Sequence, residues 1–186
     1  MEIKIEDNFL GQKEFVEIQT LIMGDEFACF FKYRYYANAG ETVESIPQDK
    51  DENELDQFQF IHQFYDLGLP RSQYMKQLQC FMDLLQPASL LRITANLLTR
   101  LPTLIENPFH SDLRKLLQEE EQKQWTTSIF YVNTNNGYTL FEDGTKVESV
   151  ANRMLIFPAN LKHTGTTCTD QQTRIVINFN YYKSTA

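Results

Sequence analysis

The segment ENPFHSDLRKL places a histidine and an aspartate two positions apart, at His110 and Asp112. In an extended chain, residues i and i+2 project from the same face, so an imidazole nitrogen and a carboxylate oxygen can meet at one point. A transition metal needs a third ligand, and His163, which lies between two short apolar segments, is predicted to supply it. His62 lies within FQFIHQFYD and is interpreted as a packed or edge histidine. Two histidines and one carboxylate on one face of an octahedron are typical of non-haem Fe(II) sites that react with oxygen.

A candidate anion-binding residue, Arg174, follows His163 on the polar face of the next predicted strand. A guanidinium group binds a carboxylate through two parallel hydrogen bonds, and a buried one needs an anionic partner. A dicarboxylate that chelates the metal at one end and contacts Arg174 at the other would satisfy both groups. The alternative is a capped turn at Asp112, a loop histidine and a solvated arginine, which treats three placements as coincidence.

The elements that must position these residues are helices early in the chain and strands later. Hydrophobic spacing predicts a helix over 7–24, with a cap at Asp7 or Asn8 and its end at Gly24, and a second helix over 70–87 that begins at Pro70. Turn signals stand at Asn136-Gly137 and Asp143-Gly144. Strands are predicted at 27–38, 58–66, 89–98, within 126–149, and at 152–158 and 173–182.

Several of these strands have one apolar and one polar face. In the strand at 173–182, for example, Ile175 and Ile177 share one face while Arg174, Asn178 and Asn180 share the other. Packing the apolar faces on the helices leaves the polar faces lining an interior. The sequence therefore predicts an α+β fold, an open sandwich or barrel of about eight strands with room for one small ligand.

Charge and cysteine content narrow the classes of function. The chain has 25 acidic and 17 basic residues, for a net charge of −8 and no basic run, which disfavours a nucleic-acid partner. Cys29, Cys80 and Cys168 form no C-x-x-C pair, so neither a disulfide framework nor a zinc knuckle is indicated. With no apolar leader and no long apolar run, a soluble cytoplasmic protein without a membrane partner is expected. The acidic segment 41–56 is interpreted as a solvent loop, with a substrate lid as the alternative.

The pattern His110, Asp112, His163 and Arg174 resembles that of the 2-oxoglutarate and Fe(II)-dependent oxygenases, in particular the prolyl 4-hydroxylase-like branch. The similarity covers roughly residues 89–182. Its most telling stretches are RITANL, FHSDL, SIFYVNTNNGYT, NRMLIFP and KHTGTTCTDQQTRIVINF. The resemblance implies a double-stranded β-helix, or jelly roll. It implies a single oxygenase domain over 1–186, in which 1–88 provide helical support and edge strands and 89–182 form the jelly-roll core.

The resemblance also implies roles for individual residues. His110, Asp112 and His163 would ligate Fe(II), and Arg174 would bind the distal carboxylate of 2-oxoglutarate. Three further residues would contact the cosubstrate. Tyr131 would hydrogen-bond that same carboxylate, Thr139 would pack beside the cosubstrate, and Asn96 stands where relatives often carry a tyrosine or another polar contact. Packing within the strands is the alternative for these three.

The activity implied by the family uses 2-oxoglutarate and O2 to hydroxylate a substrate C–H bond, with succinate and CO2 as products and ascorbate as a reductant. The expected substrate is a prolyl residue in a peptide or protein. Two other functions stay open, namely a non-catalytic jelly-roll metal-binding module and an oxidative demethylase of nucleic acid. The natural target, the hydroxylation position and the oligomeric state do not follow from the sequence.

Overall fold

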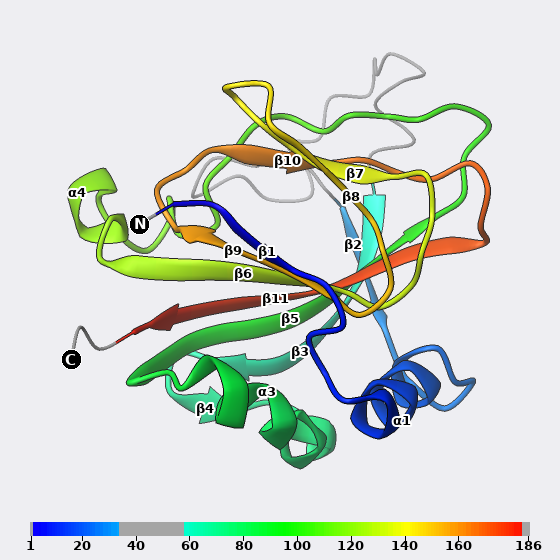
Figure 1. Ribbon diagram of the computed structural model, residues 1–186, viewed down its shortest axis with the longest axis horizontal. Helices are drawn as coiled ribbons and strands as arrows, with labels where there is room; N and C mark the ends of the chain where they lie inside the picture. Colours follow the sequence, from blue (N-terminus) through cyan, green and yellow to red (C-terminus); the bar gives the residue numbers. More distant parts are fainter. Residues whose placement is uncertain (1, 34–57, 184–186) are drawn as a thin grey trace.

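The strands of the computed structural model, which describes residues 2–33 and 58–183, form two sheets that face one another (Figure 1). All the strand pairs are antiparallel. The larger sheet has the order β1 (Lys4–Glu6), β9 (Arg153–Pro158), β6 (Trp125–Tyr131), β11 (Thr173–Tyr182), β5 (Ser89–Thr99), β3 (Phe58–Asp66) and β2 (Phe30–Tyr33), and β4 (Leu69–Pro70) pairs with β3. The smaller sheet has the order β10 (His163–Gly165), β7 (Tyr138–Phe141) and β8 (Lys146–Glu148).

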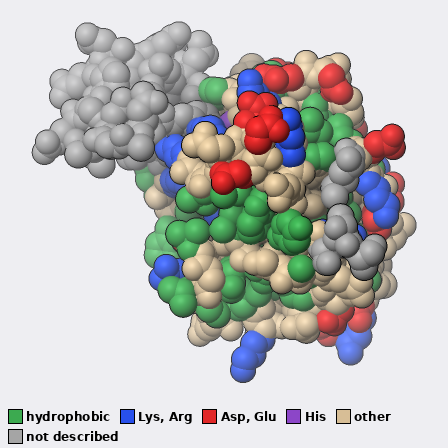
Figure 2. Space-filling model, turned by 90° about the vertical axis from the view of Figure 1, so that its left-hand side faces the viewer, with side chains coloured by type: hydrophobic (Ala, Val, Ile, Leu, Met, Phe, Trp, Pro, Cys, Tyr) green, Lys and Arg blue, Asp and Glu red, His purple; other side chains and the backbone are tan. Residues whose placement is uncertain are grey.

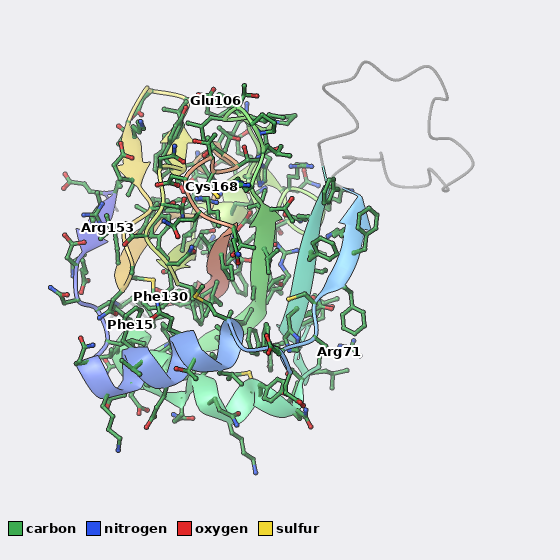
Figure 3. The ribbon with its side chains drawn as sticks, turned by 90° about the vertical axis from the view of Figure 1, so that its right-hand side faces the viewer. Phe15, Arg71, Glu106, Phe130, Arg153 and Cys168 are labelled. Atoms are coloured by element: carbon green, nitrogen blue, oxygen red, sulfur yellow. The ribbon has the colours of Figure 1, made fainter. Side chains whose placement is uncertain are left out.

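The helices cover the face of the larger sheet that points away from the smaller one (Figure 1). They are α1 (Gln12–Ile22) and α3 (Gln79–Leu85), the latter preceded by the 3-10 helix η2 (Gln73–Leu78), while the short α4 (Glu119–Gln122) lies apart from them. Phe15 of α1 and Phe130 of β6 lie between helix and sheet with ring centroids 6.4 Å apart (Figure 3). These two rings belong to a larger buried apolar cluster whose burial stabilises the packing of the helices on the sheet.

The predicted alternation of β5 and β11 divides the molecule into an apolar core and a polar cavity. Ile175, Ile177 and Phe179 of β11 are buried in the core beneath the helices. Arg174, Val176 and Asn178 of the same strand line a cavity of about 450 Å³. Because neighbouring side chains along a strand point to opposite faces, each strand serves both compartments. A smaller apolar cluster, which includes Phe141 and Phe157, closes the space between the sheets beside this cavity.

The first predicted helix begins later than expected. Its hydrophobic stripe of Phe15, Ile18 and Ile22 is buried as predicted, but Gly11 stands at the N-terminal cap and no side chain caps the helix. Asp7 is instead engaged in an ion pair with Arg153, and Asn8 has a φ of 53° in the turn that follows β1. Both residues therefore belong to the connection between strand and helix, and the predicted cap was wrong.

The second predicted helix is divided in two. Pro70 lies in β4, paired with Tyr65 of β3, rather than in a first helical turn. The helical segment starts after Ser72, whose hydroxyl accepts a hydrogen bond from the backbone N–H of Tyr74 at 3.0 Å. A two-residue edge strand tolerates proline because its missing N–H faces away from the ladder.

The two predicted turns have different roles. Asp143-Gly144 connects β7 to β8 as a hairpin, with Gly144 at a φ of 86°. Asn136-Gly137 does not form a hairpin, because β6 belongs to the larger sheet and β7 to the smaller one. This segment carries the chain from one sheet to the other. Of the predicted strand 27–38, residues 30–33 form β2, and the remainder from 34 lies outside the described residues, as does the acidic segment 41–56.

The surface is mixed in character. On the face drawn in Figure 2, hydrophobic side chains occupy much of the middle, and acidic and basic side chains surround them. Large hydrophobic residues exposed on the protein include Leu67, Leu69 and Leu84. Within residues 2–33 and 58–183, no helix combines the length and the apolar character needed to cross a membrane.

Candidate metal centre and anion pocket

Two backbone hydrogen bonds hold the predicted histidine ligands side by side. His110 donates its N–H to the His163 carbonyl at 3.0 Å, and His163 donates to the His110 carbonyl at 2.9 Å. This bridge extends β10 onto the loop that precedes Asp112, and the two imidazole rings lie with centroids 5.0 Å apart. The loop is also joined to β10 where the Thr164 hydroxyl donates to the Asn107 carbonyl at 2.6 Å. Residues distant in sequence are thus aligned by backbone pairing.

Both rings present the same nitrogen to the site. Nδ1 of His110 lies 3.1 Å from the Pro108 carbonyl, and Nδ1 of His163 lies 3.2 Å from the Leu161 carbonyl. A carbonyl oxygen can only accept, so each Nδ1 carries the proton and each Nε2 keeps a free lone pair. The two Nε2 atoms lie 3.5 Å and 3.8 Å from Oδ1 of Asp112. These three atoms form the group of possible metal ligands that the sequence predicts.

The orientation of the Asp112 carboxylate is set by two asparagines of β11. Oδ2 accepts hydrogen bonds from Asn178 at 3.3 Å and from Asn180 at 3.1 Å. Since Oδ2 is occupied in this way, Oδ1 is the oxygen left to face the histidines. Arg92 supports the arrangement by donating to the Asp112 carbonyl at 2.9 Å and to Oδ1 of Asn180 at 3.3 Å. Such partners fix the geometry of a metal ligand.

The electrostatics of the cluster favour the forms that bind a metal. Burial lowers the pKa of His163, although the Asp112 charge opposes this, so the ring stays neutral. Burial by itself would raise the pKa of Asp112, but His110, His163 and Arg92 close to the carboxylate outweigh it and hold that pKa well below its usual value. A neutral imidazole and an ionised carboxylate are the ligating species.

A buried arginine lies deeper in the same cavity. Arg174 is 2% exposed and donates to the Ser149 hydroxyl at 2.9 Å, to the Tyr138 carbonyl at 3.3 Å and to the Thr139 hydroxyl at 3.4 Å. Burial lowers the pKa of its guanidinium group. In the described parts of the chain, no carboxylate forms an ion pair with it. Burying a cation without a counter-ion is costly, so an anionic ligand beside Arg174 would be stabilising.

A glycine makes room for a ligand between the metal cluster and Arg174. Gly165 follows His163 by two positions in β10, so both lie on the same face of the strand, about 6.6 Å apart along it. A Cβ atom at Gly165 would lie 3.3 Å from Nη1 of Arg174, so a side chain there would crowd the guanidinium group. Glycine at this position therefore leaves the space between the cluster and the guanidinium group free of a side chain.

Of the three remaining predicted contacts, Thr139 and Asn96 line the cavity, whereas Tyr131 is fully buried beside Thr139 and does not line it. The Tyr131 hydroxyl donates to the Thr139 hydroxyl at 2.8 Å, and Thr139 in turn accepts from Arg174, so these three residues form one buried network. Burial raises the pKa of Tyr131, which therefore remains a neutral donor. Asn96 lines the cavity from β5, and its amide makes one long contact of 3.5 Å to the Thr94 carbonyl. It is the least constrained of the predicted residues.

His62 lies outside the site, as predicted. It is 7% exposed, and its ring nitrogens contact the Ala28 carbonyl and the Ser72 hydroxyl, both at 2.7 Å. Sequence reasoning assigned no role to Arg92, Asn178 or Asn180. The asparagines could have been found from the alternation of β11, which places them on the same face as Arg174. Nothing in the sequence indicates that they contact Asp112.

This protein resembles known proteins in structure and not detectably in sequence. No protein-family model matches this sequence, and no curated protein matches it. A prolyl hydroxylase from Trichoplax adhaerens, solved with a peptide of the oxygen degradation domain of hypoxia inducible factor, is 14% identical with a TM-score of 0.57, over 97% of this chain and 83% of that one. A prolyl-4-hydroxylase from Pseudomonas putida is 13% identical with a TM-score of 0.52, over 98% and 93%.

A third neighbour catalyses different chemistry. The epimerase SnoN, in complex with Fe3+, alpha ketoglutarate and nogalamycin RO, is 12% identical with a TM-score of 0.61, over 98% of this chain and 79% of that one. At these identities the likeness concerns the fold. The chain therefore has the double-stranded β-helix fold shared by the 2-oxoglutarate and Fe(II)-dependent oxygenases, with a His-Asp-His cluster in its cavity.

Proposed function

We propose that this protein is a 2-oxoglutarate and Fe(II)-dependent oxygenase that acts as a single domain. The observation that carries the proposal is the pairing, in one cavity, of a His-Asp-His cluster with a buried arginine that has no carboxylate partner among the described residues. Either feature alone is compatible with several kinds of binding site. Together they match the two ends of one ligand, a metal chelator with a distal carboxylate.

The donor set suits the proposed cofactor. His110, Asp112 and His163 would hold Fe(II) through two neutral nitrogens and one carboxylate oxygen, which leaves coordination positions open. Bound iron and 2-oxoglutarate would supply the activation of O2. The protein would orient the cosubstrate through the guanidinium group of Arg174 and the hydroxyl groups of Thr139 and Tyr131. Asn178 and Asn180 would keep the Asp112 carboxylate monodentate.

We further propose that the substrate is a prolyl residue of a peptide or protein, which is hydroxylated. Two of the neighbours are prolyl hydroxylases, and one of these was solved in complex with a peptide. The cavity opens to solvent beside Leu67 and Leu116, which are 55% and 43% exposed, so an extended chain has access to it. The epimerase neighbour means that this fold also serves other reactions.

The test begins with an anaerobic titration of the protein with Fe(II) and then 2-oxoglutarate. A visible charge-transfer absorption that needs both additions supports the oxygenase, and its absence from the iron-loaded protein favours a non-catalytic metal-binding module. Mass spectrometry of proline-containing peptides after incubation with Fe(II), 2-oxoglutarate, O2 and ascorbate then tests the substrate. The expected result is a gain of one oxygen on proline together with succinate. Succinate formation without modification of any proline would argue for another substrate.

A further inference from the structure

The two asparagines that hold the Asp112 carboxylate differ in how completely their side chains are hydrogen-bonded. Asn178 and Asn180 each donate an amide N–H to Oδ2 of Asp112, at 3.3 Å and 3.1 Å. Oδ1 of Asn180 in turn accepts from the guanidinium group of Arg92 at 3.3 Å. Oδ1 of Asn178 is buried and accepts a hydrogen bond from no residue in the described parts of the chain. The carboxamide of Asn180 is therefore satisfied within the protein, whereas that of Asn178 is not.

The orientation of the Asn178 carboxamide leaves its oxygen without a donor. Turning the group over would place two acceptors, Oδ1 of Asn178 and Oδ2 of Asp112, against each other, so the amide nitrogen must face the carboxylate. A buried acceptor that lacks a donor destabilises the protein in its ligand-free form. Because Asn178 lines the cavity of the metal cluster, a bound ligand can supply the missing donor.

The chemistry of the ligands narrows the source of that donor. Ionised 2-oxoglutarate has a keto group and two carboxylates, which are all acceptors, so the proposed cosubstrate cannot pair with Oδ1 of Asn178. The substrate is then the ligand that brings a donor to this oxygen. A prolyl residue within a peptide has no N–H of its own. The nearest peptide N–H belongs to the residue after the proline, because its nitrogen is bonded to the prolyl carbonyl carbon.

Two further polar side chains continue from Asn178 across the cavity wall. Thr94 of β5 is the register partner of Asn178, and Gln63 of β3 is the register partner of Thr94. All three line the cavity, and the side chains of Thr94 and Gln63 form no hydrogen bond with any residue that the structure describes. Neighbouring strands lie about 4.8 Å apart, so this row is about 10 Å long, roughly the length of three residues of an extended peptide.

We propose that the substrate is recognised through its main chain, and that Asn178 is a specificity-determining residue in this recognition. Oδ1 of Asn178 accepts the N–H of the residue after the reacting proline, and the peptide groups that follow pair with Thr94 and Gln63. Carboxamide and hydroxyl groups both donate and accept, as pairing with a peptide backbone requires, and they carry no charge with which to select a charged side chain. The proposal rests on the proposed function and specifies how the substrate of the same site is bound.

The test replaces one N–H of the substrate by an ester oxygen. The probes are a fluorescein-labelled alanine heptapeptide with proline at its centre, and the same chain with L-lactic acid in place of the alanine after the proline. Each is titrated anaerobically, by anisotropy, with the protein saturated with Fe(II) and 2-oxoglutarate. The amide peptide is expected to bind about tenfold more tightly, because the ester leaves Oδ1 of Asn178 without a donor. Equal affinities, or no binding of the amide peptide, overturn the proposal.

Variants separate this contact from the support of Asp112. Asn178→Ala removes the unpaired acceptor together with the donor to Asp112, so the preference for the amide peptide should largely disappear, whatever the loss in overall affinity. Asn180→Ala is the matched control, because it also removes a donor to Oδ2 of Asp112 but no unpaired acceptor. It should keep the preference. If Asn178→Ala keeps it as well, or if Asn180→Ala loses it equally, Asn178 acts only through Asp112 and the proposal is overturned.

A second comparison tests the path across the sheet. Thr94→Val with Gln63→Met should weaken binding of the amide peptide about fivefold and keep its preference over the ester. Thr99→Val is the control, because Thr99 lies on the same strand but does not line the cavity, and it should leave the affinity unchanged. Unchanged affinity in Thr94→Val with Gln63→Met would overturn the pairing of the substrate with Thr94 and Gln63.

Failure of this inference can be told apart from failure of the proposed function. The comparison of amide and ester can fail while the charge-transfer absorption still reports binding of 2-oxoglutarate to the iron-loaded protein. If that absorption is absent, the proposed function fails, and the inference about its substrate fails with it.

Discussion

Replacing Arg174 by methionine separates ligand binding from folding. The guanidinium group makes three hydrogen bonds to Ser149, Tyr138 and Thr139. Their loss costs about 3 kcal/mol at roughly 1 kcal/mol each. Removing a buried cation that has no carboxylate partner among the described residues recovers a desolvation cost of several kcal/mol. The two effects have opposite signs, so the free energy of unfolding of the ligand-free Arg174→Met variant should stay within about 2 kcal/mol of the wild-type value.

The effect on 2-oxoglutarate binding should be much larger. Truncating one partner of a buried charge pair costs about 2–5 kcal/mol, and 2 kcal/mol corresponds to a Kd about 30-fold higher. At a concentration 100 times the wild-type Kd, 2-oxoglutarate stabilises the wild-type protein by about 2.7 kcal/mol, whereas the variant would gain about 0.9 kcal/mol or less. Anaerobic urea denaturation with saturating Fe(II), with and without 2-oxoglutarate, measures both quantities.

Arg153→Met is the control for this experiment. Arg153 of β9 pairs with Asp7 and does not line the cavity (Figure 3). In the Arg153→Met control, 2-oxoglutarate should raise the free energy of unfolding by as much as it does in the wild-type protein. If 2-oxoglutarate stabilises Arg174→Met equally well, the guanidinium group does not bind the anion. The argument from a buried cation without a carboxylate partner is then refuted.

Further predictions concern the metal cluster and one surface ion pair. Asp112→Ala leaves two histidine ligands and should abolish Fe(II)-dependent succinate formation, so full turnover in that variant would contradict the metal assignment. Asn180→Ala removes a donor to the ligand carboxylate and should weaken Fe(II) binding about 10–100-fold in a chelator competition, with equal affinity arguing against its positioning role. Asp7→Asn should lower the unfolding free energy at pH 7 by no more than about 1 kcal/mol, because the Asp7 side chain of this ion pair is 54% exposed and solvent screens its charge. The hydrogen bond from Arg153 holds the pKa of Asp7 below its usual value, so the contribution is present above that value and is lost as the pH falls through the lowered one. Urea denaturation should therefore give stabilities for wild type and variant that converge as the pH falls below the ordinary carboxyl value of 3.8, and a constant difference would mean that the carboxylate charge is not involved.

The alternation of apolar and polar residues along β5 and β11 predicted which side chains face the apolar core and which face the polar cavity. This was possible because alternation depends only on the order of residues. The same rule that buried Ile177 placed Arg174 and Asn178 in the cavity. The proximity of His110 and Asp112 to His163 followed from residue type and from resemblance, and the roles of the cosubstrate residues stay predictions. The short strand β1 was not predicted, since three residues carry no measurable periodicity.

Contacts between side chains on different elements were the hardest to predict. Alternation places Asn178 and Asn180 on the cavity face, but their bonds to Asp112 depend on how a loop crosses the sheet. Likewise, Asp7 was expected to cap a helix, and its pairing with Arg153 comes from the register of β1 on β9. In this case the helix-capping preference of Asp7 was outweighed by an ion pair with a residue far away in the sequence.

The position of the His-Asp-His cluster depends on strand register, because reciprocal backbone hydrogen bonds pair His110 with His163. Shifting the loop by a single residue would turn one imidazole to the opposite face, so insertions or deletions between Glu106 and His110 should be intolerable. Because these bonds join main-chain atoms only, exchanging the side chain at either position should leave them in place. A cysteine or a carboxylate installed at position 110 should therefore change the metal preference of the proposed site without redesign of its backbone.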